Sequence, residues 1–179
     1  FNVQKSTRSP MVEAPEGYSS IEEFMLELNR FLIQQHEKAE RPLTQTLLNG
    51  TQLPGNLLNR DDPLIKALRV SVIKAADEFV ASLDSDDLHP FLSRKSSGLT
   101  VSGSWSVSLK NHGYHVNHVH PDGWISSSLY VSLPEELGHK SSSEGCLTLG
   151  QSSLLLSEKD FPEKVVQPKV GMVVFFPSY

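Results

Sequence analysis

Four of the seven histidines in the chain lie within the nine residues from His112 to His120. Imidazole is a common metal ligand and suits iron, zinc, copper and nickel alike. Side chains alternate between the two faces of an extended strand, so His118 and His120 are expected to project together and to close on one metal ion. His115 is expected on the opposite face. The spacing therefore indicates a metal site and leaves the identity of the metal open.

Two alternatives remain at this segment. Histidines at this spacing also occur as exposed polar residues on an edge strand. In addition, His120, Pro121 and Asp122 form a His-x-Asp pattern, in which Asp122 would complete the site in place of His118. A carboxylate of this kind is part of the two-histidine, one-carboxylate centres of non-haem iron enzymes. We rank the pair His118 and His120 first, because Pro121 and the glycine that follows Asp122 predict a turn there.

Hydroxyl groups follow the histidines in the next apolar run. In a regular strand Ser126, Ser128 and Tyr130 share one face, where they can donate hydrogen bonds to the carboxylate of a small molecule. The alternative is that Tyr130 and Trp124 are core aromatics whose polar ends find backbone partners. No Ser-His-Asp or Cys-His arrangement is evident, so we predict no catalytic side chain beyond the metal ligands.

Short strands must position these residues. Apolar residues alternate with Thr, Ser and Lys from Leu99 to Leu109, which indicates a half-buried strand with Trp105 in the core. Further short apolar runs occupy residues 114–120, 124–133, 146–149, 154–156 and 170–176, and Gly171 fits the turn that enters the last of them. Many short strands separated by turn signals favour a sandwich or barrel over a parallel sheet.

Two helices precede the strands. Ser20 and Glu23 form a capping box at the start of an amphipathic helix that ends before Pro42. Asp62 and Pro63 are typical of the start of a second helix. Its predicted buried face is formed by Leu64, Leu68, Val72, Ala75, Phe79 and Leu83. We expect residues 1–18 to be an extended lead-in, residues 43–61 to be a loop, and both helices to pack on the outside of a sheet.

Several segments together resemble the 2-oxoglutarate/Fe(II) oxygenases related to prolyl hydroxylases. The run Asn117-His118-Val119-His120-Pro121, followed by Ile125-Ser126-Ser127-Ser128-Leu129-Tyr130-Val131, is similar to the His-x-His-Pro segment and tyrosine strand of that family. Asn49-Gly50-Thr51-Gln52 looks like its lead-in region. Gly171-Met172-Val173-Val174-Phe175-Phe176-Pro177-Ser178 is similar to the segment that precedes the distal iron histidine.

This resemblance implies a mainly β fold with flanking helices, namely a double-stranded β-helix of the jelly-roll or cupin type. It implies Fe(II) as the metal, 2-oxoglutarate as cosubstrate and O2 as reactant, with hydroxylation of a substrate that the sequence does not identify. His118 would be the first ligand, and His120 would stand where the family usually has Asp or Glu. Ser126, Ser128 and Tyr130 would face the cosubstrate. The distal histidine and the basic residue that pairs with 2-oxoglutarate are expected after Tyr179, so we expect a truncated C-terminus.

Composition limits the remaining possibilities. A net charge of −5 without a basic run argues against nucleic-acid binding, and no apolar stretch approaches the roughly 20 residues that cross a bilayer. The single cysteine, Cys146, and the lack of a signal-peptide pattern favour the cytoplasm. We expect one domain, residues 19–179, whose exposed strand edges allow a homo-oligomer. The alternatives are a cupin-like metal enzyme, with Glu144 or His139 as extra ligand, and a non-catalytic jelly-roll binding or assembly module.

Overall fold

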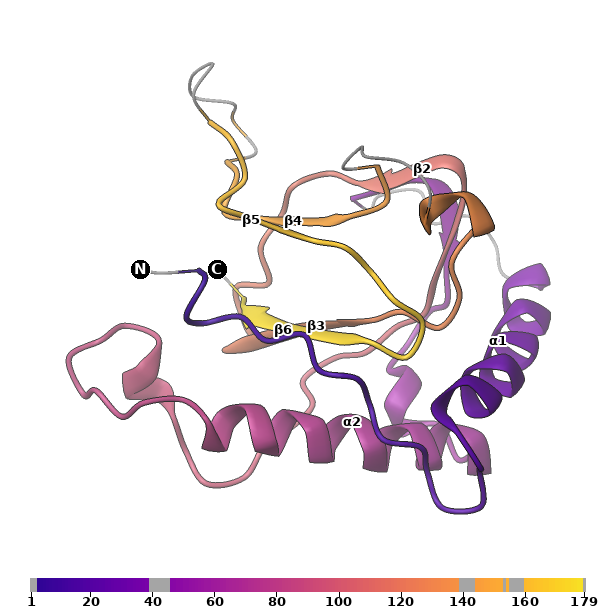
Figure 1. The fold of residues 1–179 in the computed structure, drawn as a ribbon, viewed down its shortest axis with the longest axis horizontal. Coiled ribbons are helices and arrows are strands. Elements are labelled where there is room, and N and C mark those ends of the chain that lie inside the picture. The colour runs from indigo at the N-terminus through magenta and orange to yellow at the C-terminus, as the bar shows by residue number, and fades with distance from the viewer. Residues whose placement is uncertain (1–2, 39–45, 139–143, 153, 155–159, 179) are drawn as a thin grey trace.

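The computed structural model in Figure 1 describes residues 3–38, 46–138, 144–152, 154 and 160–178. Its helices are α1 (Ile21–Glu37) and α2 (Pro63–Ala81), and its strands are β1 (Leu47–Gln52), β2 (Val107–His115), β3 (Ile125–Leu129), β4 (Leu147–Leu149), β5 (Lys164–Val166) and β6 (Val173–Pro177). Short 3-10 helices are η1 (Leu57–Asn59), η2 (Leu92–Arg94) and η3 (Glu135–Gly138). Among the described residues, neither α-helix combines the length and the apolar character that a membrane span requires.

The strands form three antiparallel pairs: β1 with β2, β3 with β6, and β4 with β5. In Figure 1, α2 runs along one side of the β3–β6 pair and the β4–β5 pair lies on the other side. The predicted β structure with two flanking helices is therefore confirmed, in the form of small antiparallel sheets. The described strands make three separate two-stranded sheets, so the closed double-stranded β-helix remains a prediction.

Strand β6 lies at the centre of the core. Val173 and Phe175 are 0% and 1% exposed and pack against α2, where the rings of Phe175 and Phe79 stack with centroids 5.4 Å apart. Val174 is also fully buried and packs on the opposite side with Leu147 of β4 and Val166 of β5. A strand that is buried on both faces carries a continuous apolar run, as β6 does. The predicted strand near the C-terminal end and the turn at Gly171, with φ of 80°, are confirmed.

The lead-in pairs with this central strand instead of lying apart from it. The backbone of Arg8 exchanges two hydrogen bonds with Phe175, at 3.1 and 2.8 Å, and Val12 donates to Gly171 at 2.9 Å. Thr7 and Val12 are 1% and 2% exposed. Residues 8–12 therefore supply hydrogen bonds to β6, and Val12 belongs to the core, while the boundary of the lead-in at residue 18 stays a prediction.

Both predicted helix starts are confirmed. The Ser20 hydroxyl accepts a hydrogen bond from the Glu23 amide at 3.2 Å, and Asp62 accepts from Leu64 and Ile65 at 2.9 and 3.3 Å. The Glu23 carboxylate departs from the capping box, because it binds the amide and hydroxyl of Ser19 rather than the Ser20 amide.

Several predicted strand boundaries are wrong. Residues 47–52, predicted as loop, form β1, which pairs with β2 through a register shift between Leu48 and Gly50. Residues 99–106 form no strand, although the carbonyls of Ser104 and Ser106 accept hydrogen bonds from Leu57 and Leu53. The predicted strand 114–120 ends at His115, β3 stops at Leu129, and β5 was not predicted. Of the predicted strand 154–156, two residues lie outside the described part of the chain.

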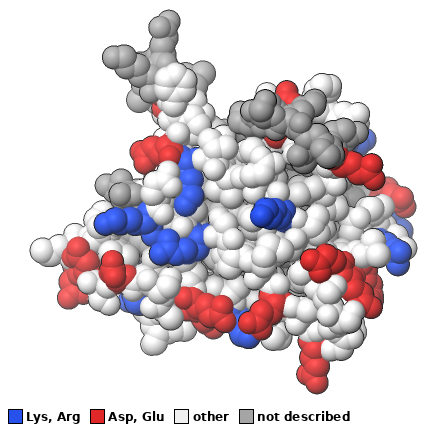
Figure 2. All heavy atoms as spheres, viewed as in Figure 1, with Lys and Arg blue, Asp and Glu red and all other residues white. Residues whose placement is uncertain are grey.

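Charged side chains of both signs are interspersed on the face shown in Figure 2. Acidic residues gather along its lower edge, and several basic residues lie near the N-terminal segment. No continuous basic stripe crosses this face, which agrees with the net charge of −5.

Candidate metal centre

Three histidine rings gather where the chain leaves β2. The ring centroids of His118 and His120 are 5.0 Å apart, and those of His115 and His118 are 5.6 Å apart. The predicted proximity of His118 and His120 is present, but the expectation that His115 points away is wrong. Strand alternation fails here because the regular strand ends at His115 and the next five residues are irregular.

The Nδ1 atom of each central histidine has a local partner. Nδ1 of His118 lies 2.7 Å from the Val116 carbonyl, and since a carbonyl only accepts, this nitrogen donates. Nδ1 of His120 lies 2.7 Å from the Ser126 hydroxyl. No hydrogen bond to Nε2 of either ring is formed by the described residues. A histidine whose Nδ1 is hydrogen-bonded and whose Nε2 is open is oriented as metal ligands commonly are.

Ser126 connects the histidines to the end of β6. Its side chain is 7% exposed, and its hydroxyl lies 2.9 Å from that of Ser178, which is 3% exposed. The backbone closes the same link, because the His120 amide donates to the Ser178 carbonyl at 2.8 Å. His120 is therefore held by both its backbone and its ring to two buried serines.

The surroundings favour the neutral form of two of these rings. Burial lowers the pKa of His120 below its ordinary value, and the neighbouring His118 lowers it further. The pKa of His115 is lowered by burial first and then by His118 and His120. Because only the neutral imidazole can ligate a metal, these shifts favour the form that binds.

Trp105, which was predicted to lie in the core, is instead a neighbour of His120. Its ring packs edge-to-face on that of His120, with centroids 5.5 Å apart and an interplanar angle of 88°. The side chain is 42% exposed, so the core prediction is wrong. The sequence offers no signal for this exposure, because serines on both sides of an apolar residue are the ordinary pattern of a half-buried strand.

A comparison with known protein families finds a match to this part of the chain. Residues 103–179 match the model of the family named "Putative 2OG-Fe(II) oxygenase". This segment is similar to the 2OG-Fe(II) oxygenase family. No curated protein and no solved structure shows significant similarity to the chain. The match covers the histidines, β3 and β6, and supports an oxygenase at the level of the family.

The other residues predicted for the oxygenase site lie further along β3. Ser128 pairs with Val174. Tyr130 follows the end of the strand and packs against the buried cluster of Val166, Met172 and Val174. Burial, with a smaller contribution from Cys146, raises the pKa of Tyr130 to about 12. Its hydroxyl therefore stays protonated and able to donate. Trp124 takes the alternative role foreseen for it, because it packs in the core and its indole N–H donates to the Phe91 carbonyl at 2.8 Å.

The described residues supply imidazoles but not a complete metal shell. No group of three or more His, Cys, Asp or Glu among them is arranged to hold a metal ion. Asp122 is exposed in the predicted turn, which the Gly123 amide closes onto the His120 carbonyl at 3.0 Å. Glu144 is exposed, and His139 lies outside the described residues. The donor chemistry of His118 and His120 fits Fe(II), and these two residues would provide part of its coordination.

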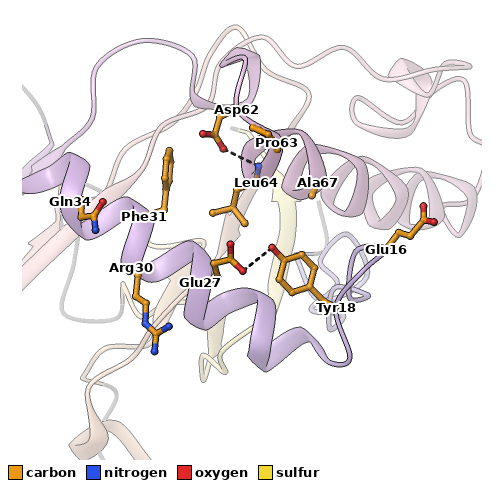
Figure 3. Close-up of a pocket in the computed structure, with 10 residues that line it drawn as sticks. All are labelled: Glu16, Tyr18, Glu27, Arg30, Phe31, Gln34, Asp62, Pro63, Leu64 and Ala67. Carbon is orange, nitrogen blue, oxygen red and sulfur yellow. Dashed lines mark hydrogen bonds between the residues drawn. The ribbon is translucent and has the colours of Figure 1, made fainter.

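A groove of about 600 Å³ opens elsewhere, between α1 and the start of α2. Figure 3 shows Leu64 and Phe31 between the two helices and the hydroxyl of Tyr18 bonded to Glu27. Its lining is Glu16, Tyr18, Glu27, Arg30, Phe31, Gln34, Asp62, Pro63, Leu64 and Ala67. None of these belongs to the histidine segment, so this groove is separate from the candidate metal centre.

Proposed function

We propose that the chain is a 2-oxoglutarate- and Fe(II)-dependent oxygenase in which His118 and His120 are metal ligands. The observation that carries the proposal is the adjacent pair of imidazoles with bonded Nδ1 atoms and open Nε2 atoms, within a segment similar to the 2OG-Fe(II) oxygenase family. Asp122 is the alternative ligand to His118.

With Fe(II) and 2-oxoglutarate bound, such a site couples O2 to oxidation of a substrate C–H bond, giving a hydroxylated product, succinate and CO2. The protein supplies position and a dry pocket for this chemistry. His118 and His120 hold the metal, and Ser126 fixes the ring of His120 through its 2.7 Å contact. We further propose that Ser126, Ser128 and Tyr130 line the cosubstrate side, where the protonated Tyr130 hydroxyl donates to a 2-oxoglutarate carboxylate.

Anaerobic titration with Fe(II) and 2-oxoglutarate tests the proposal. We expect a weak visible charge-transfer band from the chelated complex, which is lost in His118→Ala and His120→Ala. His112→Asn is the matched control, because His112 is exposed on β2 with φ of 62° and asparagine tolerates that conformation. The charge-transfer band of the His112→Asn variant should equal that of the parent chain.

The other outcomes separate the alternatives. Loss of the band in Asp122→Asn, with retention in His118→Ala, would transfer the ligand role to Asp122. Metal binding without a 2-oxoglutarate band would indicate a cupin-like enzyme that uses no such cosubstrate. A chain that binds no metal would be a binding module, and the oxygenase proposal would be wrong.

A further inference from the structure

Trp105 is held in place from both sides by its neighbours. The Ser104 carbonyl accepts from Leu57 at 2.7 Å, and its hydroxyl accepts from the Leu58 amide at 2.8 Å. On the other side, the Ser106 carbonyl accepts from Leu53 at 2.9 Å, and its hydroxyl lies 2.9 Å from Nε2 of His36 on α1. Ser104 and Ser106 thus form hydrogen bonds to residues 53–58 and to His36, while the indole between them packs on His120.

The indole of Trp105 is partly exposed to solvent and is not buried in the core. Trp124, the second tryptophan of the chain, is partly buried against the core and its indole N–H binds the Phe91 carbonyl. Trp105 is 42% exposed, and the described residues offer no hydrogen bond to its N–H. A rigid aromatic side chain that is left half open beside a candidate metal centre has one face available for another molecule.

The chain segment that carries the indole and the histidines contains few charged residues. Val116 and Val119, which flank the histidines in sequence, are 42% and 61% exposed. Between Lys95 and Asp122 the chain contains a single Asp, Glu, Lys or Arg, namely Lys110. A charged ligand group would lose its hydration here without gaining a counter-charge from this segment, whereas an apolar group would gain contact with the indole.

We propose that Trp105 is a specificity-determining residue that forms one wall of the substrate site, and that this wall selects substrates presenting a neutral apolar group to the histidine pair. The inference rests on the proposed function, since it takes His118 and His120 as the reacting centre. Trp105 acts on substrate choice and carries no step of the reaction.

Tryptophan NMR signals of the full chain provide the test. The chain has two tryptophans, so ¹⁵N-tryptophan labelling gives two indole signals, and Trp105→Phe assigns them. Benzyl alcohol, benzoate and benzylammonium serve as neutral, anionic and cationic probes of matched size. We expect benzyl alcohol to shift the Trp105 signal and to bind at least about tenfold more tightly than either ion, a difference of about 1.4 kcal/mol. The Trp124 signal should not move.

Variants distinguish probe binding at Trp105 from nonspecific hydrophobic binding. Trp105→Ser should weaken benzyl alcohol binding about tenfold, measured from the ligand signals. Trp105→Phe should restore most of it, because it keeps an aromatic wall. Leu88→Ser is the matched control, since Leu88 is 96% exposed and lies outside the histidine segment. Equal binding of the three probes, or unchanged binding in Trp105→Ser, would overturn the inference.

Zn(II) distinguishes this inference from the proposed function. A metal at His120 should shift the Trp105 signal, and His118→Ala should abolish that shift. A Zn(II) shift without discrimination among the probes overturns the apolar wall and leaves the metal proposal standing. Discrimination among the probes without a Zn(II) shift supports the apolar site and overturns the metal assignment.

Discussion

At the scale of single residues, the Ser126 hydroxyl is the group that most directly fixes a proposed ligand. Ser126→Ala removes the partner of Nδ1 of His120, so we expect Zn(II) affinity to fall about 10- to 100-fold. Ser127→Ala is the matched control, because Ser127 is exposed and points to the other face of β3. Calorimetric titration with Zn(II) measures both, and equal affinities would show that Ser126 does not orient the ligand.

The same residues show how far strand alternation predicts a site. Within β3 the backbone is regular, and Ser126 is buried while the adjacent Ser127 is exposed, as strand alternation requires. Past His115 the backbone is irregular, and alternation put His115 on the wrong side. The contact between Trp105 and His120 was not predictable, because hydrogen bonds from residues remote in sequence set the direction of the indole.

At the scale of elements, the start of α2 depends on one of two adjacent carboxylates. Asp62→Ala removes the cap of the Leu64 and Ile65 amides and should lower the free energy of unfolding by about 1 kcal/mol. Asp61→Ala should change it by less than about 0.5 kcal/mol, because Asp61 is 90% exposed in a surface pair with Lys66. Urea denaturation compares the two, and equal losses would contradict the capping role.

Helix α1 is attached to β1 and to residue 106 by His36. Its Nδ1 lies 2.8 Å from the Thr51 hydroxyl and its Nε2 lies 2.9 Å from that of Ser106. Burial lowers the pKa of His36 below its ordinary value of 6.5, so the unfolded chain takes up its proton first as the pH falls. The stability that His36 contributes is therefore present above pH 6.5 and decreases as the pH falls from there toward the lower pKa of the folded state.

Replacement of His36 should flatten this dependence. We expect the free energy of unfolding of His36→Gln to fall less steeply than that of the parent chain between about pH 7 and pH 5, since the half-buried His36 no longer titrates. Denaturation at several pH values measures both slopes. A variant with the slope of the parent would show that His36 does not contribute.

Elements that are fixed by contacts between residues close in sequence were predicted. Elements that depend on pairing with residues remote in sequence were not. The caps of α1 and α2 lie within three residues of the amides that they bind, so the sequence contains the whole interaction. Strand β1 contains Asn49 and Gly50, which look like a loop. In the structure Asn49 has φ of 54°, and a Cβ on Gly50 would lie 2.7 Å from the Ser108 carbonyl, as a bulge against β2 requires.

At the scale of the whole molecule, Phe175 joins three parts of the chain, because its backbone pairs with Arg8 and its ring stacks on Phe79 of α2. Phe175→Ala should lower the free energy of unfolding by about 3–5 kcal/mol through the lost burial and the cavity. Phe161→Ala is the control, since Phe161 is 73% exposed and should cost less than about 0.5 kcal/mol. Losses of similar size would mean that β6 is not the centre of the core.

The pairing of residues 8–12 with β6 also affects the order in which the chain can fold during synthesis. Lys164 on β5 and the Thr7 carbonyl that it approaches are 157 positions apart in the chain, and the two serines beside His120 are 52 apart. At roughly 5–20 residues added per second, the ribosome holds the N-terminal segment without its partner strand for many seconds. The histidines emerge earlier than Ser178, so the contacts that hold His120 to Ser126 and Ser178 are complete only after β6 has left the ribosome.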